Sequence, residues 1–123
     1  MAAEHLISII DDDHSMREAL AGLVRSLGHE VQAFASAEEF LASNELKRVS
    51  CAVSDIQMPG MSGFELQRQL SQLHGDVPVI IITALTEPDL EDRAMSNGAA
   101  FFLRKPFEAE TFLGCLERAL EGT

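Results

Sequence analysis

Short apolar runs and helix-like patterns take turns along the chain. The runs are only a few residues long and are rich in isoleucine, valine, phenylalanine and leucine, which is typical of buried strands. We expect five strands, at residues 6–10, 31–34, 51–55, 77–83 and 100–103. The run 77–83 does not alternate with polar residues, as expected for a central strand buried on both faces, and Pro78 is tolerated near its start.

The segments that follow these runs repeat apolar residues every three or four positions. The first keeps such residues between Ala19 and Leu27 before Gly28 ends the pattern, and the last shows an apolar stripe from Phe112 to Leu120. Both patterns predict helices with one buried face. Strand and helix signals that alternate five times predict an α/β domain whose parallel sheet is covered by helices on both faces.

Serine residues mark the predicted starts of three helices. Ser15, Ser36 and Ser62 each stand three residues before a glutamate, and S-x-x-E is the capping box that satisfies free N–H groups at a helix start. From these signals and the apolar pattern we expect the second helix to reach about residue 44, the third to span 63 to about 73, and the fourth to run from near 88 to 98.

Composition indicates one domain. A chain of 123 residues, 46% of them hydrophobic and 24% charged, is long enough for one core and too short for two. We expect residues 1–123 to form a single domain, with no output domain in this chain. No apolar run approaches the length of a membrane span and the start lacks the pattern of a signal peptide, so a cytoplasmic domain is expected.

The charge and the cysteine and histidine content argue against nucleic-acid binding, a disulfide and a zinc site. The formal net charge of −11 repels phosphate backbones and the nine basic residues are scattered, so this segment is not expected to bind DNA or RNA itself. Cys51 and Cys115 lie in apolar contexts without C-x-x-C spacing, which is typical of small core residues rather than a disulfide or zinc site. The four histidines show no metal-ligand spacing.

Polar residues that could take part in chemistry follow four of the predicted strands. Asp11 and Asp12 follow the first strand, Asp55 ends the third, Thr83 ends the fourth and Lys105 comes just after the fifth. In a doubly wound sheet, ligands bind at the carboxyl ends of the strands that flank the reversal of strand order. These five side chains are therefore expected to meet at one edge of the sheet.

Such a cluster suits phosphoryl chemistry. Two carboxylates about 4 Å apart repel each other by about 4 kcal/mol at an effective dielectric constant near 20. A hard divalent cation relieves this repulsion, and Mg²⁺ prefers carboxylate, carbonyl and water oxygens. With Asp11 and Asp12 holding the metal, Asp55 can attack phosphorus to form an aspartyl phosphate, while Lys105 and Thr83 contact the phosphoryl oxygens.

Each of these residues also has an ordinary structural explanation. A carboxylate after a strand often caps a helix, threonine is a common strand residue, and a lysine before proline is usually a solvated loop cation. Taken together they favour function, because Ser62 already supplies the cap after Asp55. The acids Asp11 and Asp12 lie too far ahead of Ser15 to share its capping role.

Four segments carry a resemblance to a known family. They are IIDDD at 9–13, SDIQMPGMSG at 54–63, IIIT-A at 80–84 and FFLRKPF at 101–107. In order and spacing they resemble the signature segments of receiver domains of two-component response regulators, over nearly the whole chain. The resemblance implies a CheY-like, flavodoxin-like α/β fold, a doubly wound parallel sheet of five strands in the order 2-1-3-4-5.

The resemblance also implies roles for individual residues. Asp55 would be the phosphoacceptor, and Asp11, Asp12, Asp55 and the backbone carbonyl of Gln57 would bind Mg²⁺, for which Mn²⁺ could substitute. Thr83 and Lys105 would contact the phosphoryl group, and Phe102 would be the switch aromatic, although the neighbouring Phe101 leaves an ordinary core ring as its alternative. The domain would be a phosphoacceptor switch that promotes its own phosphorylation and dephosphorylation rather than an enzyme.

The implied partners follow from the same family. A sensor histidine kinase would supply the phosphoryl group, and the face formed by the fourth helix, fifth strand and fifth helix would control homodimerisation or an output domain. The segments FASAEEFL at 34–41 and MPGMSGFELQRQL at 58–70 resemble receivers of the FixJ type, whose chains usually continue into a helix-turn-helix domain. DNA would then be bound only through that output domain, in transcription regulation.

Three alternatives differ in chemistry. A stand-alone receiver would act by protein contact alone. A phosphorylation-independent interaction module is disfavoured because every position of the site is filled. A phosphatase of the haloacid dehalogenase kind also uses aspartyl phosphate and Mg²⁺, but it needs a carboxylate two residues after the nucleophile, where this chain has Gln57, and a longer chain.

Overall fold

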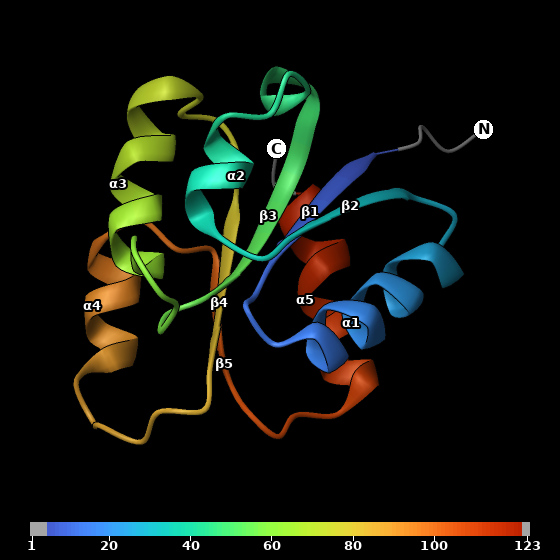
Figure 1. Cartoon of the computed structure of the whole chain (residues 1–123). Coiled ribbons are helices and arrows are strands. Elements are labelled where there is room, and N and C mark those ends of the chain that lie inside the picture. The colour runs from blue at the N-terminus through green and yellow to red at the C-terminus, as the bar shows by residue number, and fades with distance from the viewer. Residues whose placement is uncertain (1–4, 122–123) are drawn as a thin grey trace.

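Five strands and five α-helices alternate along residues 5–121, the part of the chain that this computed structural model describes (Figure 1). The strands are β1 (Leu6–Ile10), β2 (Glu30–Phe34), β3 (Val49–Asp55), β4 (Val79–Thr83) and β5 (Phe101–Arg104). The α-helices are α1 (His14–Ser26), α2 (Ala37–Leu41), α3 (Gly63–Leu73), α4 (Leu90–Ser96) and α5 (Ala109–Glu121), with a 3₁₀ turn η1 (Leu46–Arg48) before β3.

All strand pairs are parallel and the strand order is β2-β1-β3-β4-β5, which confirms the expected fold class. The chain moves from β1 outward to β2, then crosses back to β3 on the other side of β1. The order of the strands therefore reverses between β1 and β3, and the carboxyl ends of these two strands flank the place where α/β folds bind ligands. In Figure 1 the loops that follow β4 and β5 lie at this same lower edge.

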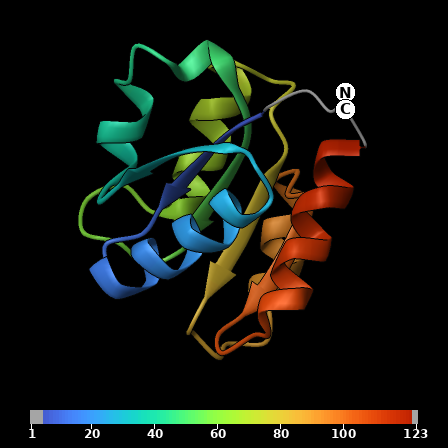
Figure 2. The same cartoon turned by 90° about the vertical axis from the view of Figure 1, so that its right-hand side faces the viewer.

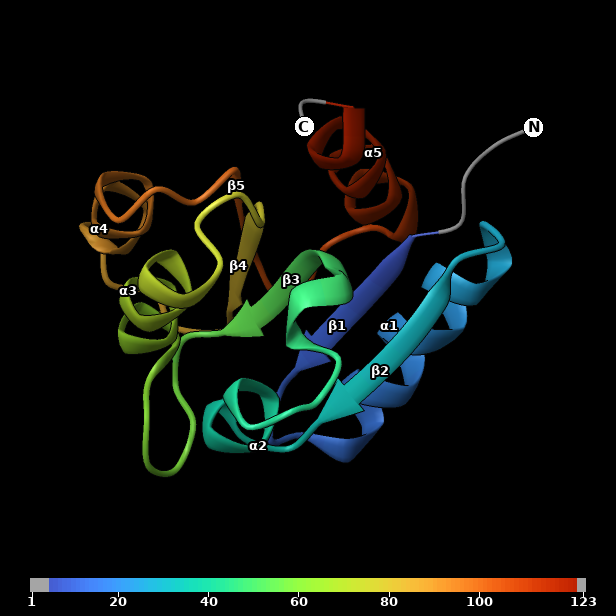
Figure 3. The same ribbon diagram turned by 90° about the horizontal axis from the view of Figure 1, so that it is seen from above.

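Helices cover both faces of the sheet. Viewed from above, α1 and α5 lie on one side and α2, α3 and α4 on the other (Figure 3), and Figure 2 shows α1 and α5 in front of the sheet. Every residue of β1 and β4 is buried. Strands covered on both faces have no solvent side, which explains why the sequence of 77–83 shows no polar alternation.

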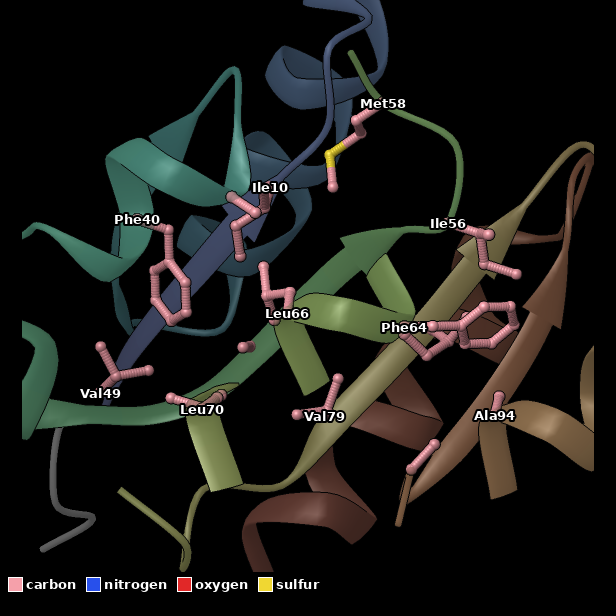
Figure 4. Close-up of a cluster of buried hydrophobic side chains, with 14 of the residues drawn as sticks. Ile10, Phe40, Val49, Ile56, Met58, Phe64, Leu66, Leu70, Val79 and Ala94 are labelled. Carbon is pink, nitrogen blue, oxygen red and sulfur yellow. The ribbon is translucent and has the colours of Figure 1, made fainter. Parts of the chain in front are cut away.

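Two hydrophobic clusters lie on either side of the sheet. Side chains alternate along each strand, so that Ile81 belongs to the cluster beneath α2, α3 and α4, whereas Ile80 and Ile82 belong to the cluster beneath α1 and α5. Figure 4 shows the first cluster, in which Met58 reaches down from the loop after β3 toward Ile10. Burying one such side chain contributes roughly 1.5–3 kcal/mol, so both clusters hold the strand ends in place.

One predicted helix cap is wrong. Helix α1 begins at His14, and its N-cap is Asp13, whose carboxylate accepts hydrogen bonds from the backbone N–H groups of Ser15 and Met16. The end of β1 delivers Asp13 to the capping position, so Ser15 already lies inside the helix. The other two caps are confirmed, because Ser36 and Ser62 accept from the N–H groups of Glu39 and Glu65.

Several element ends differ from the sequence-based ranges. Strand β4 begins at Val79 rather than at 77, because Pro78 has no N–H to donate, although its carbonyl accepts from Ala52. Helix α4 begins at Leu90 rather than near 88, and α2 ends at Leu41 rather than near 44. Among residues 5–121, no helix has both the length and the apolar character that crossing a membrane requires.

Candidate functional site

Three carboxylates meet at the carboxyl ends of β1 and β3. Asp11 and Asp12 directly follow β1, and Asp55 is the last residue of β3. One oxygen from each of the three side chains lies within 4.8 Å of the others. Asp11 is fully buried, Asp55 is 8% exposed and Asp12 faces solvent. The structure thus brings together the acidic residues that the sequence placed at this edge.

Backbone groups fix the two buried carboxylates. One oxygen of Asp11 accepts from the N–H of Asp13 at 2.9 Å, and one oxygen of Asp55 accepts from the N–H of Ile56 at 2.8 Å. The guanidinium of Arg17 also donates to the backbone carbonyl of Asp11 at 2.7 Å. Because short bonds to the backbone leave little rotational freedom, the remaining oxygens of Asp11 and Asp55 are aimed at the same space.

Lys105 fills part of that space. Its ammonium lies 3.0 Å from Oδ2 of Asp11 and 3.5 Å from Oδ2 of Asp55. The backbone positions this lysine, because its N–H donates to the carbonyl of Thr83 at 2.7 Å where β5 continues beside β4. Burial alone would lower the pKa of Lys105, but the hydrogen bond to Asp11 and the charge of Asp55 outweigh burial and raise it. Lys105 is therefore a permanent cation of the site.

Asp55 is held in an environment that disfavours its charge. Burial raises its pKa above the ordinary value of 3.8, and the neighbouring charge of Asp11 raises it further, while Lys105 and the N–H of Ile56 act in the opposite direction. A raised pKa means that the folded protein binds a proton at Asp55 more tightly than the unfolded chain does. Further positive charge at this site would therefore favour the ionised form.

The donor set fits a hard divalent cation. Three carboxylates carry three negative charges against the single positive charge of Lys105, which leaves two negative charges to be balanced. All the side-chain donors are oxygens, the ligand type that Mg²⁺ and Mn²⁺ prefer. A cleft of about 560 Å³ opens beside them, lined by Asp12, Asp13, Asp55, Gln57, Met58, Pro59, Ala84 and Lys105.

The loop after Asp55 is anchored in two ways. Met58 is buried in the hydrophobic cluster of Figure 4, so this loop residue also belongs to the core. Gly63 packs so closely that a Cβ atom there would overlap the carbonyl oxygen of Asp55 and lie 3.0 Å from the Cα of Ile56. Its N–H donates to the carbonyl of Ile56 at 2.8 Å. Only glycine allows this approach of α3 to the phosphoacceptor candidate.

Thr83 lies at the same edge but is bonded elsewhere. Its side chain is fully buried at the end of β4, and its hydroxyl oxygen accepts from the N–H of Leu85 at 3.0 Å. Among the described residues, no hydrogen bond joins Thr83 to Asp55 or Lys105 through its side chain. The sequence placed Thr83 at the correct strand end, while its present partner is its own loop.

The two phenylalanines of β5 lie on opposite faces. Phe102 is half-buried and packs against the cluster beneath α3 and α4, whereas Phe101 packs against the other cluster. Phe102 is therefore the ring on the face that carries α4, and its role as the switch aromatic stays a prediction.

Sequence reasoning missed the side chains that hold backbone carbonyls. Arg17 binds the carbonyl of Asp11, and Arg104 binds the carbonyls of Leu85 and Glu87. A basic residue next to a signature residue, as Arg104 is to Lys105, is a weak signal, since most such residues are solvated.

Comparisons with known proteins agree with this architecture. The sequence model of the response regulator receiver domain matches residues 7–117. The response regulator protein TodT of Pseudomonas putida is 40% identical over 116 residues, which cover 94% of this chain and 51% of TodT. The transcriptional regulatory protein FixJ of Rhizobium meliloti is 37% identical over 118 residues, or 96% of this chain and 58% of FixJ.

A solved structure supports the same relationship. The response regulator StyR has 42% sequence identity and a TM-score of 0.87, with 97% of this chain and 60% of that chain covered. The chain spans about half the length of the curated relatives TodT and FixJ. From the family match and these similarities, the chain belongs to the response regulator receiver domain family.

Proposed function

We propose that residues 1–123 form a single receiver domain that is switched by phosphorylation of Asp55. The observation that carries this proposal is the shared ammonium of Lys105, which lies within 3.5 Å of Oδ2 of both Asp11 and Asp55 beside an open cleft. A nearly buried carboxylate at a strand end, supplied with a cation and further carboxylates, is suited to receive a phosphoryl group.

The donor would be a phosphohistidine of a sensor histidine kinase. A carboxylate oxygen of Asp55 forms the new O–P bond while the P–N bond of the donor breaks. The imidazole nitrogen keeps the electrons of that bond and takes a proton from water. Lys105, 3.5 Å from Asp55, would neutralise a phosphoryl oxygen, and the N–H of Ile56 holds the carboxylate in orientation.

Asp11, Asp12, Asp55 and the backbone carbonyl of Gln57 would hold Mg²⁺, for which Mn²⁺ could substitute. The bound ion would neutralise charge on the phosphoryl oxygens. The exposed Asp12 is open to the cleft, whereas Asp11 is committed to Lys105 and to the N–H of Asp13. Asp12 is therefore the carboxylate with the fewest competing partners.

The output would be a change of surface. When Thr83 donates its hydroxyl to a phosphoryl oxygen, the loop after β4 moves and the ring of Phe102 follows. The face formed by α4, β5 and α5 would then control homodimerisation or an output domain. Because TodT and FixJ are named as regulators and this chain spans about half of each, we propose a transcriptional output.

Acceptance of a phosphoryl group can be tested by mass spectrometry. The domain, incubated with Mg²⁺ and acetyl phosphate, should gain the mass of one phosphoryl group, and hydroxylamine should remove it because an acyl phosphate is labile to this nucleophile. Asp55→Asn should abolish the gain, whereas Asp76→Asn, a change in an exposed turn, should leave it intact. Chelation of the metal should prevent the reaction.

Two results would contradict the proposal. The lack of any adduct on the unmodified domain would favour an interaction module that works without phosphorylation. Rapid multiple turnover of assorted phosphate esters would instead indicate a phosphatase.

A further inference from the structure

The loop between β4 and α4 is lightly held. Residues 84–88 are mostly exposed, and in the described part of the chain three hydrogen bonds are recorded for them. One is the bond from the Leu85 N–H to the hydroxyl of Thr83. The other two come from a single side chain, Arg104 at the end of β5. A loop with so few bonds depends strongly on each of them.

Arg104 joins the loop after β4 to a ring on β5. One guanidinium nitrogen donates to the carbonyl of Leu85 at 2.6 Å and the other to the carbonyl of Glu87 at 2.9 Å. The central carbon of the same guanidinium lies 5.2 Å from the centre of the Phe102 ring. A cation at this distance from a ring is attracted to its face. The planar fork of arginine can make both bonds and this ring contact at once, which a lysine ammonium cannot.

These contacts form a continuous path between the two proposed switch residues. Thr83 holds the N–H of Leu85, the carbonyl of Leu85 is held by Arg104, and Arg104 lies over Phe102. The loop cannot move away from β5 without breaking two charge-assisted hydrogen bonds or moving the guanidinium, and with it the surroundings of the ring.

We propose that Arg104 is a positioning residue that couples the loop after β4 to the ring of Phe102. This proposal rests on the proposed function, since the loop movement that Arg104 transmits would be started at Asp55 and Thr83. Arg104 does not touch Asp55, Asp11 or Lys105 among the recorded hydrogen bonds and ion pairs of the described residues. Its removal should therefore disconnect the ring from the site without impairing the site itself.

Fluorine NMR can follow the ring directly. The chain has seven phenylalanines and no tyrosine or tryptophan, so labelling with fluorophenylalanine gives few signals, and Phe102→Leu identifies the one from Phe102. Beryllofluoride with Mg²⁺, a phosphoryl mimic, should shift this signal in the unmodified domain. In Arg104→Ala the shift should fall to below about a third of its original size, while the mimic binds within about threefold of its original affinity.

Two further variants separate coupling from charge and from general packing. Arg104→Lys keeps the charge but loses the fork, and it should behave more like Arg104→Ala than like the unmodified domain. Arg118→Ala is the matched control, because Arg118 lies over the ring of Phe101, 5.4 Å from its centre, on the other face of β5. It should leave the response of Phe102 unchanged.

A second measurement needs no phosphoryl mimic. Thr83→Ala removes the acceptor of the Leu85 N–H, and we expect it to move the Phe102 signal in the unmodified background but not in Arg104→Ala. Equal responses of Phe102 with and without Arg104 would overturn the coupling, as would full retention in Arg104→Lys. If beryllofluoride fails to bind the unmodified domain, the proposed function fails, while the Thr83→Ala comparison still decides the role of Arg104.

Discussion

The two halves of the site edge are built differently. At the ends of β1 and β3, Asp11 and Asp55 are buried, each bonded to a backbone N–H and to Lys105, and Gly63 brings α3 against the backbone of Asp55. At the end of β4 the following loop is exposed and depends on Thr83 and Arg104. The first half is held by packing together with buried polar bonds, and the second by a few polar bonds to an exposed loop.

This difference suits a switch. Groups that accept a phosphoryl group are most effective when they are held in place before the reaction. A segment that reports the reaction must instead have a second conformation of similar free energy, and a few hydrogen bonds set a difference of only a few kcal/mol. Changes in the first half should therefore act on stability and chemistry, and changes in the second half on the output.

The largest effect is expected from Gly63→Ala. The added Cβ would overlap the carbonyl oxygen of Asp55, and both neighbours are backbone atoms that cannot rotate away. We expect a loss of about 3 kcal/mol in the free energy of unfolding, because overpacked backbone contacts are relieved only by moving α3 away from β3. Urea denaturation measures this loss.

Gly114→Ala is the matched control for this change. Gly114 lies within α5, and a Cβ there would meet no atom within 4 Å. Because alanine favours the helix over glycine, we expect a gain of about 0.5–1 kcal/mol. Equal urea midpoints for Gly63→Ala and the unmodified domain would show that α3 is not packed tightly against Asp55.

Thr83→Ala should act on the output rather than on acceptance. The variant should still gain a phosphoryl group, since Asp55 and Lys105 keep their contacts. It should lose at least about tenfold in phosphorylation-dependent homodimerisation, a coupling of about 1.4 kcal/mol, because the loop no longer responds through the hydroxyl. Sedimentation with and without beryllofluoride measures this.

Lys105→Ala offers the contrast, because it should weaken phosphorylation as well as dimerisation. Unchanged coupling between phosphorylation and dimerisation in Thr83→Ala would remove Thr83 from the mechanism.

The fold and the acidic cluster could be predicted from the sequence because both depend on repeated or local signals. Apolar runs alternate with helical patterns, and parallel strands bring their carboxyl ends to one edge. Asp11, Asp55 and Lys105 were placed correctly for this reason. The cap of α1 was misassigned because the sequence motif at Ser15 is valid in itself, while the end of β1 delivers Asp13 to the capping position first.

Hydrogen bonds from arginine side chains to backbone carbonyls could not be predicted. Arg104 reaches carbonyls 17 and 19 residues earlier, and Arg17 binds the carbonyl of Asp11. Such bonds follow from how the strands and loops are placed in space, and they leave no periodic pattern in the sequence.

A smaller effect is expected from Asp55→Asn. The fold raises the pKa of Asp55 through burial and the charge of Asp11, so the ionised side chain costs stability. That cost is absent below the ordinary pKa of 3.8 and complete above the raised pKa of the folded state. Near neutral pH, with the metal removed by a chelator, the variant should be more stable by about 1 kcal/mol.

The pH dependence provides the check on this prediction. The advantage of Asp55→Asn should shrink as the pH falls toward 3.8, and urea denaturation at several pH values follows it. Asp76→Asn, in an exposed turn, should change the stability by less than about 0.5 kcal/mol. An advantage that stays constant with pH would mean that the charge of Asp55 is not the cause.

The smallest effect is expected from a contact at the margin of the first half, between α2 and the loop after β3. Glu38, in the first turn of α2, accepts a hydrogen bond from the N–H of Met61 at 3.0 Å and so ties α2 to the loop after β3. This contact joins the segments FASAEEFL and MPGMSGFELQRQL, and it lies against Gly60, whose φ of +80° also favours glycine.

Because this bond is exposed, Glu38→Ala should cost only about 0.5 kcal/mol in the free energy of unfolding. Glu38→Gln keeps an acceptor oxygen for Met61 and should retain most of the stability, and urea denaturation together with hydrogen exchange at the Met61 amide separates the two variants. Faster exchange at Met61 in Glu38→Ala, with Leu85 unaffected, would show that the two halves of the edge are anchored independently. A parallel change at Leu85 would contradict the division into a fixed half and a movable one.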